Sequence, residues 1–209
     1  MGENLFTVRK FEAGDADDCA MCFYYGFFDC PLTKKDREFL RDYVQVLIEK
    51  CSFTYVALAD GKVIGFISGS YKKSFNIALA RKSDTKRHYW AWIKCFAKFS
   101  FRGYKLSPAF REQFDAFFRR IRERNKHTPM ACDCELVALT SRREYRRGLG
   151  TALWMTFAGR CASDGVKRIR LFTDSDASYD FYERRGFTRV WSKPYSFGGG
   201  SSYVYEFKL

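Results

Sequence analysis

Apolar side chains in the N-terminal part of the chain recur with two different periods. Alternation with a period of two predicts strands, and recurrence every three to four residues predicts helices. Thr33 has the side chain of a helix N-cap, and Asp60-Gly61 is a pair typical of a tight hairpin turn. In chain order the pattern predicts a strand, two helices and two strands, at 5–11, 16–28, 33–50, 55–59 and 63–70.

The segment 72–131 departs from this regular alternation of elements and contains two helical patterns, at 86–99 and 108–125. The first reads HYWAWIKCFAKF and is apolar nearly all round, so we expect it to be buried or packed on a partner. The second gathers Phe110, Phe114 and Phe117 on one face, with arginines around it. We interpret the aromatic face as packing on the domain. A surface for nucleic acid or an anionic membrane stays open as the alternative.

The C-terminal part resumes with a strand over 135–140, in which alternation is expected to place Glu135, Val137 and Leu139 on one face and Cys134, Leu136 and Ala138 on the other. A helix that opens on Gly148-Leu149-Gly150 follows, and then a half-buried strand in which Arg168 and Arg170 face outward. We expect one domain over 1–209, an α/β fold with a mixed sheet covered by helices on both faces. The remaining elements are a strand, a helix and two strands, at 166–173, 178–185, 187–197 and 202–209.

Composition agrees with a folded, reduced protein. Apolar residues make up 46% and aromatic residues 19% of 209 residues, which argues against disorder. The N-terminus has no apolar segment of a signal peptide, so we expect a cytoplasmic protein with free thiols. Cys19 and Cys22 form a CxxC, but without a second ligand pair or a nearby His we interpret them as core residues and expect no metal.

Positive charge is concentrated in one segment. Residues 71–126 hold 16 Lys and Arg against 4 Asp and Glu, and so account for +12 of the formal net charge of +13. Charge of this density near a binding site would disfavour polycationic acceptors such as aminoglycosides.

The stretch 134–153, CELVALTSRREYRRGLGTAL, combines a strand, a basic turn and a helix start. Gly148 and Gly150 would let a ligand approach the backbone closely, and the first amides of the helix attract anions. A Walker A loop would need a Lys-Ser/Thr pair, and a dinucleotide fingerprint would need glycine at Leu153. The turn therefore predicts a site for some other phosphorylated ligand. A tight strand–helix connection without a ligand is the competing interpretation.

A second stretch, TDSDASYDFYERRGF over 173–187, carries Phe181-Tyr182 and closes on Gly186-Phe187. Together the two stretches resemble motifs A and B of the GNAT N-acetyltransferases, which move acetyl groups from acetyl-CoA to amines. Three positions depart from the family pattern: Tyr145 occupies its Gln/Arg position, and Ser175 and Ser178 occupy its Asn and Ala positions. The resemblance covers residues 133–192 well.

The resemblance implies an acetyl-CoA-dependent N-acetyltransferase of GNAT fold with a helical insertion between its third and fourth strands. Its general-acid tyrosine corresponds to Tyr182 and its carboxylate base to Glu135. A tyrosine packed in the core and a solvated carboxylate are the competing interpretations. The implied cofactor-binding residues are Leu139, Thr140, Arg142, Arg146, Arg147, Gly148, Leu149, Gly150, Thr151 and Ser175.

The residues offer no covalent nucleophile, because no G-x-S-x-G elbow is present and both histidines lie in 72–131. Direct attack by a primary amine of a small molecule or peptide is therefore expected, with Tyr89, Trp90 or Trp92 of the insertion facing the acceptor. The alternative is a GNAT-fold binding module whose insertion docks nucleic acid or membrane. A homodimer stays open.

Overall fold

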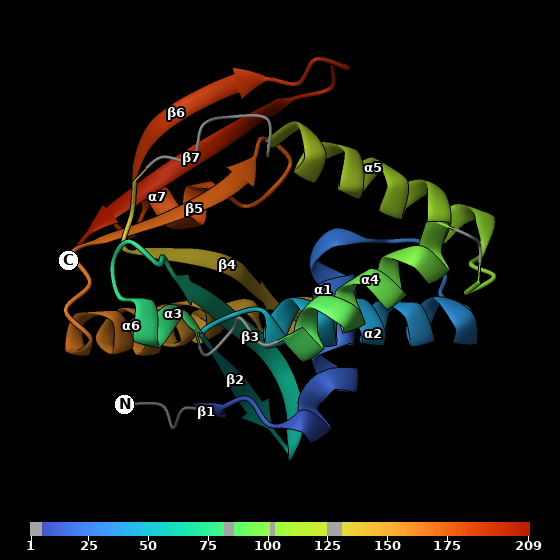
Figure 1. The fold of residues 1–209 in the computed structure, drawn as a ribbon, viewed down its shortest axis with the longest axis horizontal. Coiled ribbons are helices and arrows are strands. Elements are labelled where there is room, and N and C mark those ends of the chain that lie inside the picture. Colours follow the sequence, from blue (N-terminus) through green and yellow to red (C-terminus); the bar gives the residue numbers. More distant parts are fainter. Residues whose placement is uncertain (1–5, 82–85, 101–102, 125–130) are drawn as a thin grey trace.

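Seven strands form one mixed sheet through the middle of the molecule (Figure 1). The computed structural model describes residues 6–81, 86–100, 103–124 and 131–209, without the side chains of 81, 86–91, 94, 124, 146 and 147. The strand order is β1-β2-β3-β4-β5-β7-β6; β4 and β5 are parallel and the other neighbours antiparallel. The strands are β1 (Thr7–Lys10), β2 (Phe53–Ala59), β3 (Lys62–Tyr71), β4 (Cys134–Ser141), β5 (Arg168–Asp174), β6 (Thr188–Pro194) and β7 (Ser201–Lys208).

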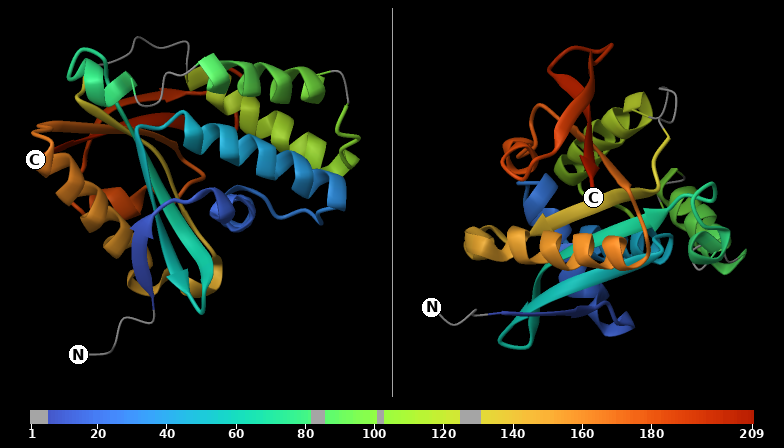
Figure 2. Two further views of the ribbon diagram at one scale, coloured as in Figure 1. Left: turned by 60° about the horizontal axis from the view of Figure 1, so that its bottom comes forward. Right: turned by 90° about the vertical axis from the view of Figure 1, so that its left-hand side faces the viewer.

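Helices cover both faces of this sheet, as the sequence predicts (Figure 2). On one face α6 (Arg146–Ser163) inserts Leu149, Leu153 and Phe157, all fully buried. On the other face lie α1 (Ala16–Phe27) and α2 (Lys34–Glu49). Each face therefore has its own apolar core, and the sheet separates the two.

The expected N-terminal elements are confirmed, because their sequence signals act locally. Thr33 caps α2 by accepting a hydrogen bond from the Asp36 amide at 3.2 Å, and the Asp36 carboxylate accepts one from the Thr33 amide at 2.8 Å. Asp60 and Gly61 both have positive φ, as a two-residue hairpin turn between β2 and β3 requires.

Between β3 and β4 the chain forms α3 (Ile77–Arg81), α4 (Lys86–Ser100) and α5 (Pro108–Arg124), of which the sequence predicted the latter two. The aromatic face of α5 packs on the domain: Phe110 and Phe114 are fully buried, and both lie within 6.1 Å of the Phe28 and Phe39 rings. Our interpretation of that face is confirmed.

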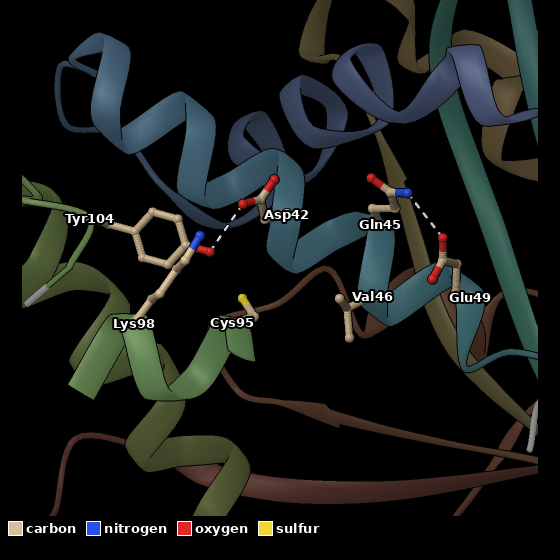
Figure 3. A pocket seen from close by; sticks show the side chains of 7 residues that line it. All are labelled: Asp42, Gln45, Val46, Glu49, Cys95, Lys98 and Tyr104. Carbon is tan, nitrogen blue, oxygen red and sulfur yellow. Dashed lines mark hydrogen bonds between the residues drawn. The ribbon is translucent and has the colours of Figure 1, made fainter. Parts of the chain in front are cut away.

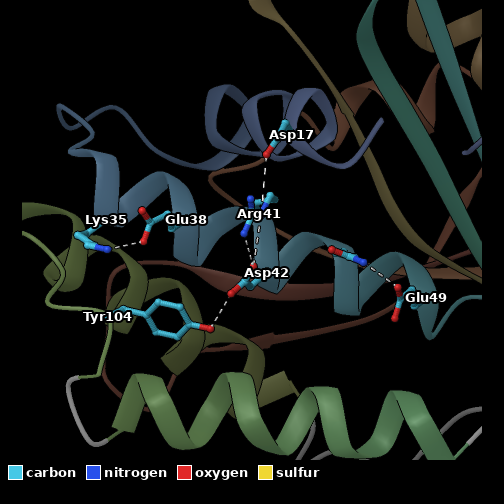
Figure 4. Close-up of polar contacts among 8 residues, drawn as sticks. Asp17, Lys35, Glu38, Arg41, Asp42, Glu49 and Tyr104 are labelled. Atoms are coloured by element: carbon cyan, nitrogen blue, oxygen red, sulfur yellow. Dashed lines mark hydrogen bonds and ion pairs between the residues drawn. The ribbon is translucent and has the colours of Figure 1, made fainter. Parts of the chain in front are cut away.

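Polar contacts to α2 fix the same segment (Figure 4). The Tyr104 hydroxyl donates to Asp42 at 3.0 Å, and the Ser107 amide donates to Asp36 at 2.9 Å. Arg41 pairs with Asp42 at 3.2 Å. Because Asp36 also caps α2, one buried carboxylate sets both the start of α2 and the position of α5.

Three expectations need correction. The helix α6 begins at Arg146, before the two glycines, so Gly148 lies inside its first turn with φ +78°. The expected helix over 178–185 is the single turn α7 (Asp180–Glu183). Arg170 is buried rather than outward and pairs with Glu206 at 2.6 Å, because β7 supplies a carboxylate that the pattern of β5 alone does not reveal.

Candidate functional site

Strands β4 and β5 separate along their length. They pair only from Cys134 to Leu136 of β4, with Ile169 to Leu171 of β5, although β4 continues to Ser141 and β5 to Asp174. Beyond Leu136 the edge of β4 that faces β5 has no strand partner among the described residues, so its backbone groups can bind a ligand. The predicted oxyanion-binding amides near Leu139 and Thr140 lie in this separated part.

A bulge in β4 corrects the predicted faces of this strand. Leu136 pairs with Gly69 and Ala138 with Ser68, so Val137 is an extra residue. Leu136 packs in the core with α6, whereas Ala138 packs in the core with α1 and α2. Strict alternation is thus wrong across Val137. Glu135, next to Leu136, lies on the face opposite α6.

The bulge also decides which groups of Thr140 are free to bind a ligand. Its hydroxyl donates to the Cys22 carbonyl of α1 at 2.6 Å, and the side chain is 5% exposed. A Cβ on Gly26 would lie 2.5 Å from that hydroxyl oxygen, so the glycine lets α1 rest on β4. Only the backbone of Thr140 is left for a ligand.

The first turn of α6 has open space beside its backbone at Gly148. A Cβ at Gly148 would meet no atom within 4 Å, so the space above this residue is free. Leu149 turns its side chain into the core and leaves only its amide toward the turn. Free amides at the start of an 18-residue helix favour an anion here.

Gly150 differs from Gly148. A Cβ at Gly150 would lie 2.8 Å from Cε2 of Phe181, so the ring of α7 fills the space that a side chain would need. The need for glycine at this position is explained by packing between α6 and α7. That packing sets the position of the next residue of α7, Tyr182.

Arg185 is a site residue that the sequence analysis missed. Its guanidinium lies 3.5 Å from the centre of the Phe181 ring and donates to the Thr151 hydroxyl near the start of α6. Burial lowers the pKa of Arg185 relative to its ordinary value, with Arg184 adding to the effect. One signal was available: Arg185 directly precedes Gly186-Phe187 of the second motif.

The remaining predicted cofactor residues lie in different surroundings. Arg142 donates to Asp18 of α1 at 2.8 Å and so has a structural partner. Ser175 accepts a hydrogen bond from the Ser201 amide at 3.0 Å, which ties the end of β5 to β7. The side chains of Arg146 and Arg147 lie outside the described residues; their backbone begins α6.

Tyr182 lies against Phe187 and Tyr205, with ring centres 5.5 and 6.3 Å away. Burial raises the pKa of its phenol above the ordinary value, so the hydroxyl stays protonated at neutral pH. The described residues give this hydroxyl no hydrogen-bond partner. A neutral donor of this kind suits proton transfer to a leaving thiolate.

Glu135 forms an ion pair with Lys72, the residue after β3, and its side chain is 18% exposed. Burial by itself would lower the pKa of Lys72. The negative charge of Glu135 outweighs this effect and raises the pKa of Lys72 above its ordinary value. Glu135 pairs in register with Arg170 of β5 at the point where β4 and β5 begin to separate. A carboxylate is thus present on the face of the sheet opposite α6.

A pocket of about 200 Å³ lies elsewhere, between α2 and α4 (Figure 3). Its acidic groups are occupied, since Asp42 accepts from Tyr104 and Glu49 accepts from Gln45 at 3.0 Å. It contains neither of the predicted motifs, so we do not assign the chemistry to it.

The cysteines fit the structural interpretation. All eight are free and buried, and burial raises the pKa of Cys22 to about 12. Across the described ranges no group of His, Cys, Asp and Glu could hold a metal ion. In the same ranges no helix combines the length and the apolarity that a membrane crossing needs.

Comparison with known proteins agrees with this geometry. The model of the acetyltransferase (GNAT) family matches residues 118–187, from α5 to the end of the second motif. No curated protein matches the chain by sequence. The family match and the fold indicate an acyltransferase, and they give no support to the alternative of a pure binding module.

Solved structures share the fold at low sequence identity. A GNAT-family protein from Desulfovibrio desulfuricans is 13% identical, with a TM-score of 0.57 and coverage of 97% of this chain and 98% of its own. The PaiA N-acetyltransferase of Thermoplasma acidophilum in complex with coenzyme A is 14% identical, with a TM-score of 0.52 and coverage of 98% and 99%. The ribosomal-protein-S18-alanine N-acetyltransferase of Escherichia coli is 12% identical, with a TM-score of 0.52 and coverage of 98% and 94%. The predicted fold class is confirmed.

Proposed function

Because this chain has the GNAT fold and matches that acetyltransferase family over residues 118–187, we propose that it is an acetyl-CoA-dependent N-acetyltransferase acting on a primary amine. One observation carries the proposal: the separated strands β4 and β5, the open turn at Gly148 and the Tyr182 hydroxyl, which has no hydrogen-bond partner among the described residues, belong to one continuous region. A protein that only used the fold as a scaffold would have no need for all three together.

The region fits coenzyme A. The free amides at the start of α6, up to Leu149, would hold the pyrophosphate over the segment Gly148 to Thr151, and Arg146 and Arg147 would add positive charge at the same place. Arg185 would stand beside the phosphates through its contact with Thr151. The free edge of β4 at Leu139 and Thr140 would hold the pantetheine arm by backbone hydrogen bonds, and Ser175 lies at the end of the facing strand.

The chemistry needs no covalent intermediate. The nitrogen lone pair of the acceptor attacks the thioester carbonyl carbon, and an amide N–H of β4 near Leu139 stabilises the oxyanion. When the C–S bond breaks, the sulfur keeps the bonding electrons and the Tyr182 hydroxyl donates its proton to it. Glu135, held by Lys72, takes one proton of the incoming ammonium through a water molecule. After the attack the nitrogen loses its second proton, which returns through solvent to the Tyr182 phenolate, so the amide product is neutral and Tyr182 is protonated again.

The acceptor is a small molecule or a peptide amine. A cytoplasmic location is supported by eight free, buried cysteines. The homodimer stays a prediction, which size-exclusion chromatography with light scattering tests.

Substitution of Tyr182 tests the catalytic assignment. Tyr182→Phe removes the proton donor and keeps the ring packing, so kcat should fall about 10²-fold or more while CoA affinity is unchanged. Steady-state kinetics with calorimetric CoA titration separates the two quantities. An unchanged kcat would reassign Tyr182 to packing.

Substitution of Gly148 tests the cofactor site. Asn tolerates positive φ better than other residues with a side chain, so Gly148→Asn adds bulk above the turn with little backbone strain. CoA affinity should fall at least about tenfold. Gly165→Asn is the matched control, because Gly165 has φ +80° and open space at the other end of α6. Equal CoA affinity in both variants would refute the cofactor assignment.

A further inference from the structure

The helix α5 connects the two sides of the separation between β4 and β5. Figure 1 shows it running from beside α2 and α4 toward the end of β5 and the loop between β6 and β7. Its two halves hold on to different parts of the molecule, and the contacts of each half can be followed residue by residue.

The N-terminal half of α5 is attached on the β4 side. Gln113 exchanges hydrogen bonds with Asp29 just after α1, and its side-chain oxygen accepts from the Asp29 amide at 3.2 Å. Phe110 lies 5.3 Å from Phe28 between ring centres. Helix α1 in turn rests on β4 through Thr140. This half of α5 is therefore fixed relative to the separated part of β4.

The C-terminal half of α5 is attached on the β5 side. Arg120 pairs with Asp176, two residues beyond β5, at 2.9 Å. Arg119 lies 5.6 Å from the centre of the Phe197 ring in the loop between β6 and β7. The helix thus bridges the gap on the face opposite α6, which is also the face of Glu135.

From this arrangement we propose that α5 roofs the acceptor side of the site and restricts the acceptor to a primary amine at the end of a slender chain. This inference rests on the proposed function. A free small amine or a flexible polypeptide segment can pass beside α5, whereas a lysine on a folded surface cannot.

The dimensions support this restriction. An α-helix with its side chains is about 10 Å thick, and an extended lysine side chain reaches about 6 Å from its Cα. A lysine anchored on a rigid surface outside α5 is therefore too short to reach the separated strands past the helix.

This assignment differs from the one expected from the sequence. Trp92 lies over Lys50, at 5.0 Å from its ammonium nitrogen, and packs on Phe96, so it faces the end of α2 instead of the acceptor. The side chains of Tyr89 and Trp90 lie outside the described residues. The wall of the acceptor site is assigned to α5 in their place.

Deleting the insertion would be a poor test, because Phe110 and Phe114 belong to the same core as α1 and α2. A single exposed ion pair is worth only about 0–1 kcal/mol, so removing Arg120 alone would not release α5. The test should therefore compare acceptors and lock the helix, with the fold left intact.

The acceptor comparison uses one protein in two states. Native lysozyme and the same lysozyme unfolded by reduction and carboxymethylation present the same lysines, and butylamine serves as a free small amine. The rate of acetylation is measured by mass spectrometry. At least one of the two accessible acceptors, butylamine or unfolded lysozyme, should be acetylated at least about 100-fold faster than native lysozyme. Comparable acetylation of native and unfolded lysozyme would overturn the roof and leave the proposed function standing. No acetylation of any amine, including a broad library of small amines, would overturn the proposed function and this inference with it.

The lock uses Arg120→Cys/Asp176→Cys joined by a short bis-maleimide, since the eight native cysteines are buried. If α5 stays in place during turnover, the cross-linked protein should keep its rate on the preferred amine within about twofold. Arg122→Cys/Asp176→Cys treated with the same reagent is the control for modification, because Arg122 is exposed on the same helix. Loss of activity only on cross-linking 120 to 176 would show that α5 must open, and would overturn the roof.

Discussion

At the residue scale, the two glycines of the first motif have different physical roles. Gly148 has positive φ and free space, so it suits the proposed contact with the ligand. Gly150 has its space filled by Phe181, so it serves the packing that positions Tyr182. A motif written as one pattern of two glycines therefore contains one residue proposed for binding and one needed for packing.

We expect Gly150→Ala to destabilise the protein by about 1–3 kcal/mol, because the new Cβ would lie 2.8 Å from the Phe181 ring. Displacement of α7 should also lower kcat. Chemical denaturation and kinetics measure the two effects. Gly159→Ala in the same helix meets open space and should be neutral or stabilising.

A double-mutant cycle identifies the cause. Phe181→Val removes the clashing ring atoms, so Gly150→Ala/Phe181→Val should be more stable than the sum of the single effects predicts. Simple additivity would mean that Gly150 is needed for another reason.

At the element scale, one carboxylate joins α2 to the insertion. Asp36 is fully buried and accepts hydrogen bonds from Thr33 and Ser107. Burial alone would raise its pKa, but the hydrogen bonds from Thr33 and Ser107 hold the pKa of Asp36 below its ordinary value. The start of α2 and the start of α5 thus depend on the same charge.

This linkage predicts a pH dependence. Because the pKa of Asp36 is lower folded than unfolded, its contribution is complete above the unfolded pKa of about 4 and is lost as pH falls through the folded value. Asp36→Asn should lower the free energy of unfolding at pH 7. Between pH 5 and pH 3 the free energy of unfolding of this variant should fall less than that of wild type. Denaturation at each pH measures this. Asp17→Asn, an exposed aspartate of α1, is the control and should follow wild type.

At the scale of the whole molecule, positive charge reaches the proposed acceptor entrance. The formal net charge is +13, and α5 brings Arg119 and Arg120 to the edge of the site. A field of this sign attracts anionic acetyl-CoA and repels polycations.

We expect salt to act with opposite signs on the two substrates. Between about 10 and 150 mM ionic strength the Debye length falls from about 30 to about 8 Å. The KM for acetyl-CoA should therefore rise with salt, whereas the KM for a polyamine acceptor should fall. A neutral-bodied monoamine is the reference for effects of salt on the chemical step. A polyamine KM that rises with salt would place the basic helix away from the entrance.

Much of this protein follows from local sequence signals. The Thr33 cap, the Asp60-Gly61 turn, the aromatic face of α5 and the two motifs act over a few residues, so their elements and the GNAT fold could be predicted. Tyr182 and Gly148 could also be predicted from local signals, since the motif residues next to them in the chain identify them.

Other features depend on pairings between distant segments, which no local period encodes. The bulge at Val137 is set by the register with β3 and moves Glu135 to the other face from Leu139. Arg170 is buried because β7 brings Glu206 beside it. The bridge by α5 needs Asp29 and Asp176, which lie 147 positions apart in the sequence and meet the same helix only in the folded chain. The sequence by itself determined most of the elements and the residues of the proposed site, because their signals are local, and tertiary packing decided which faces, partners and walls surround that site.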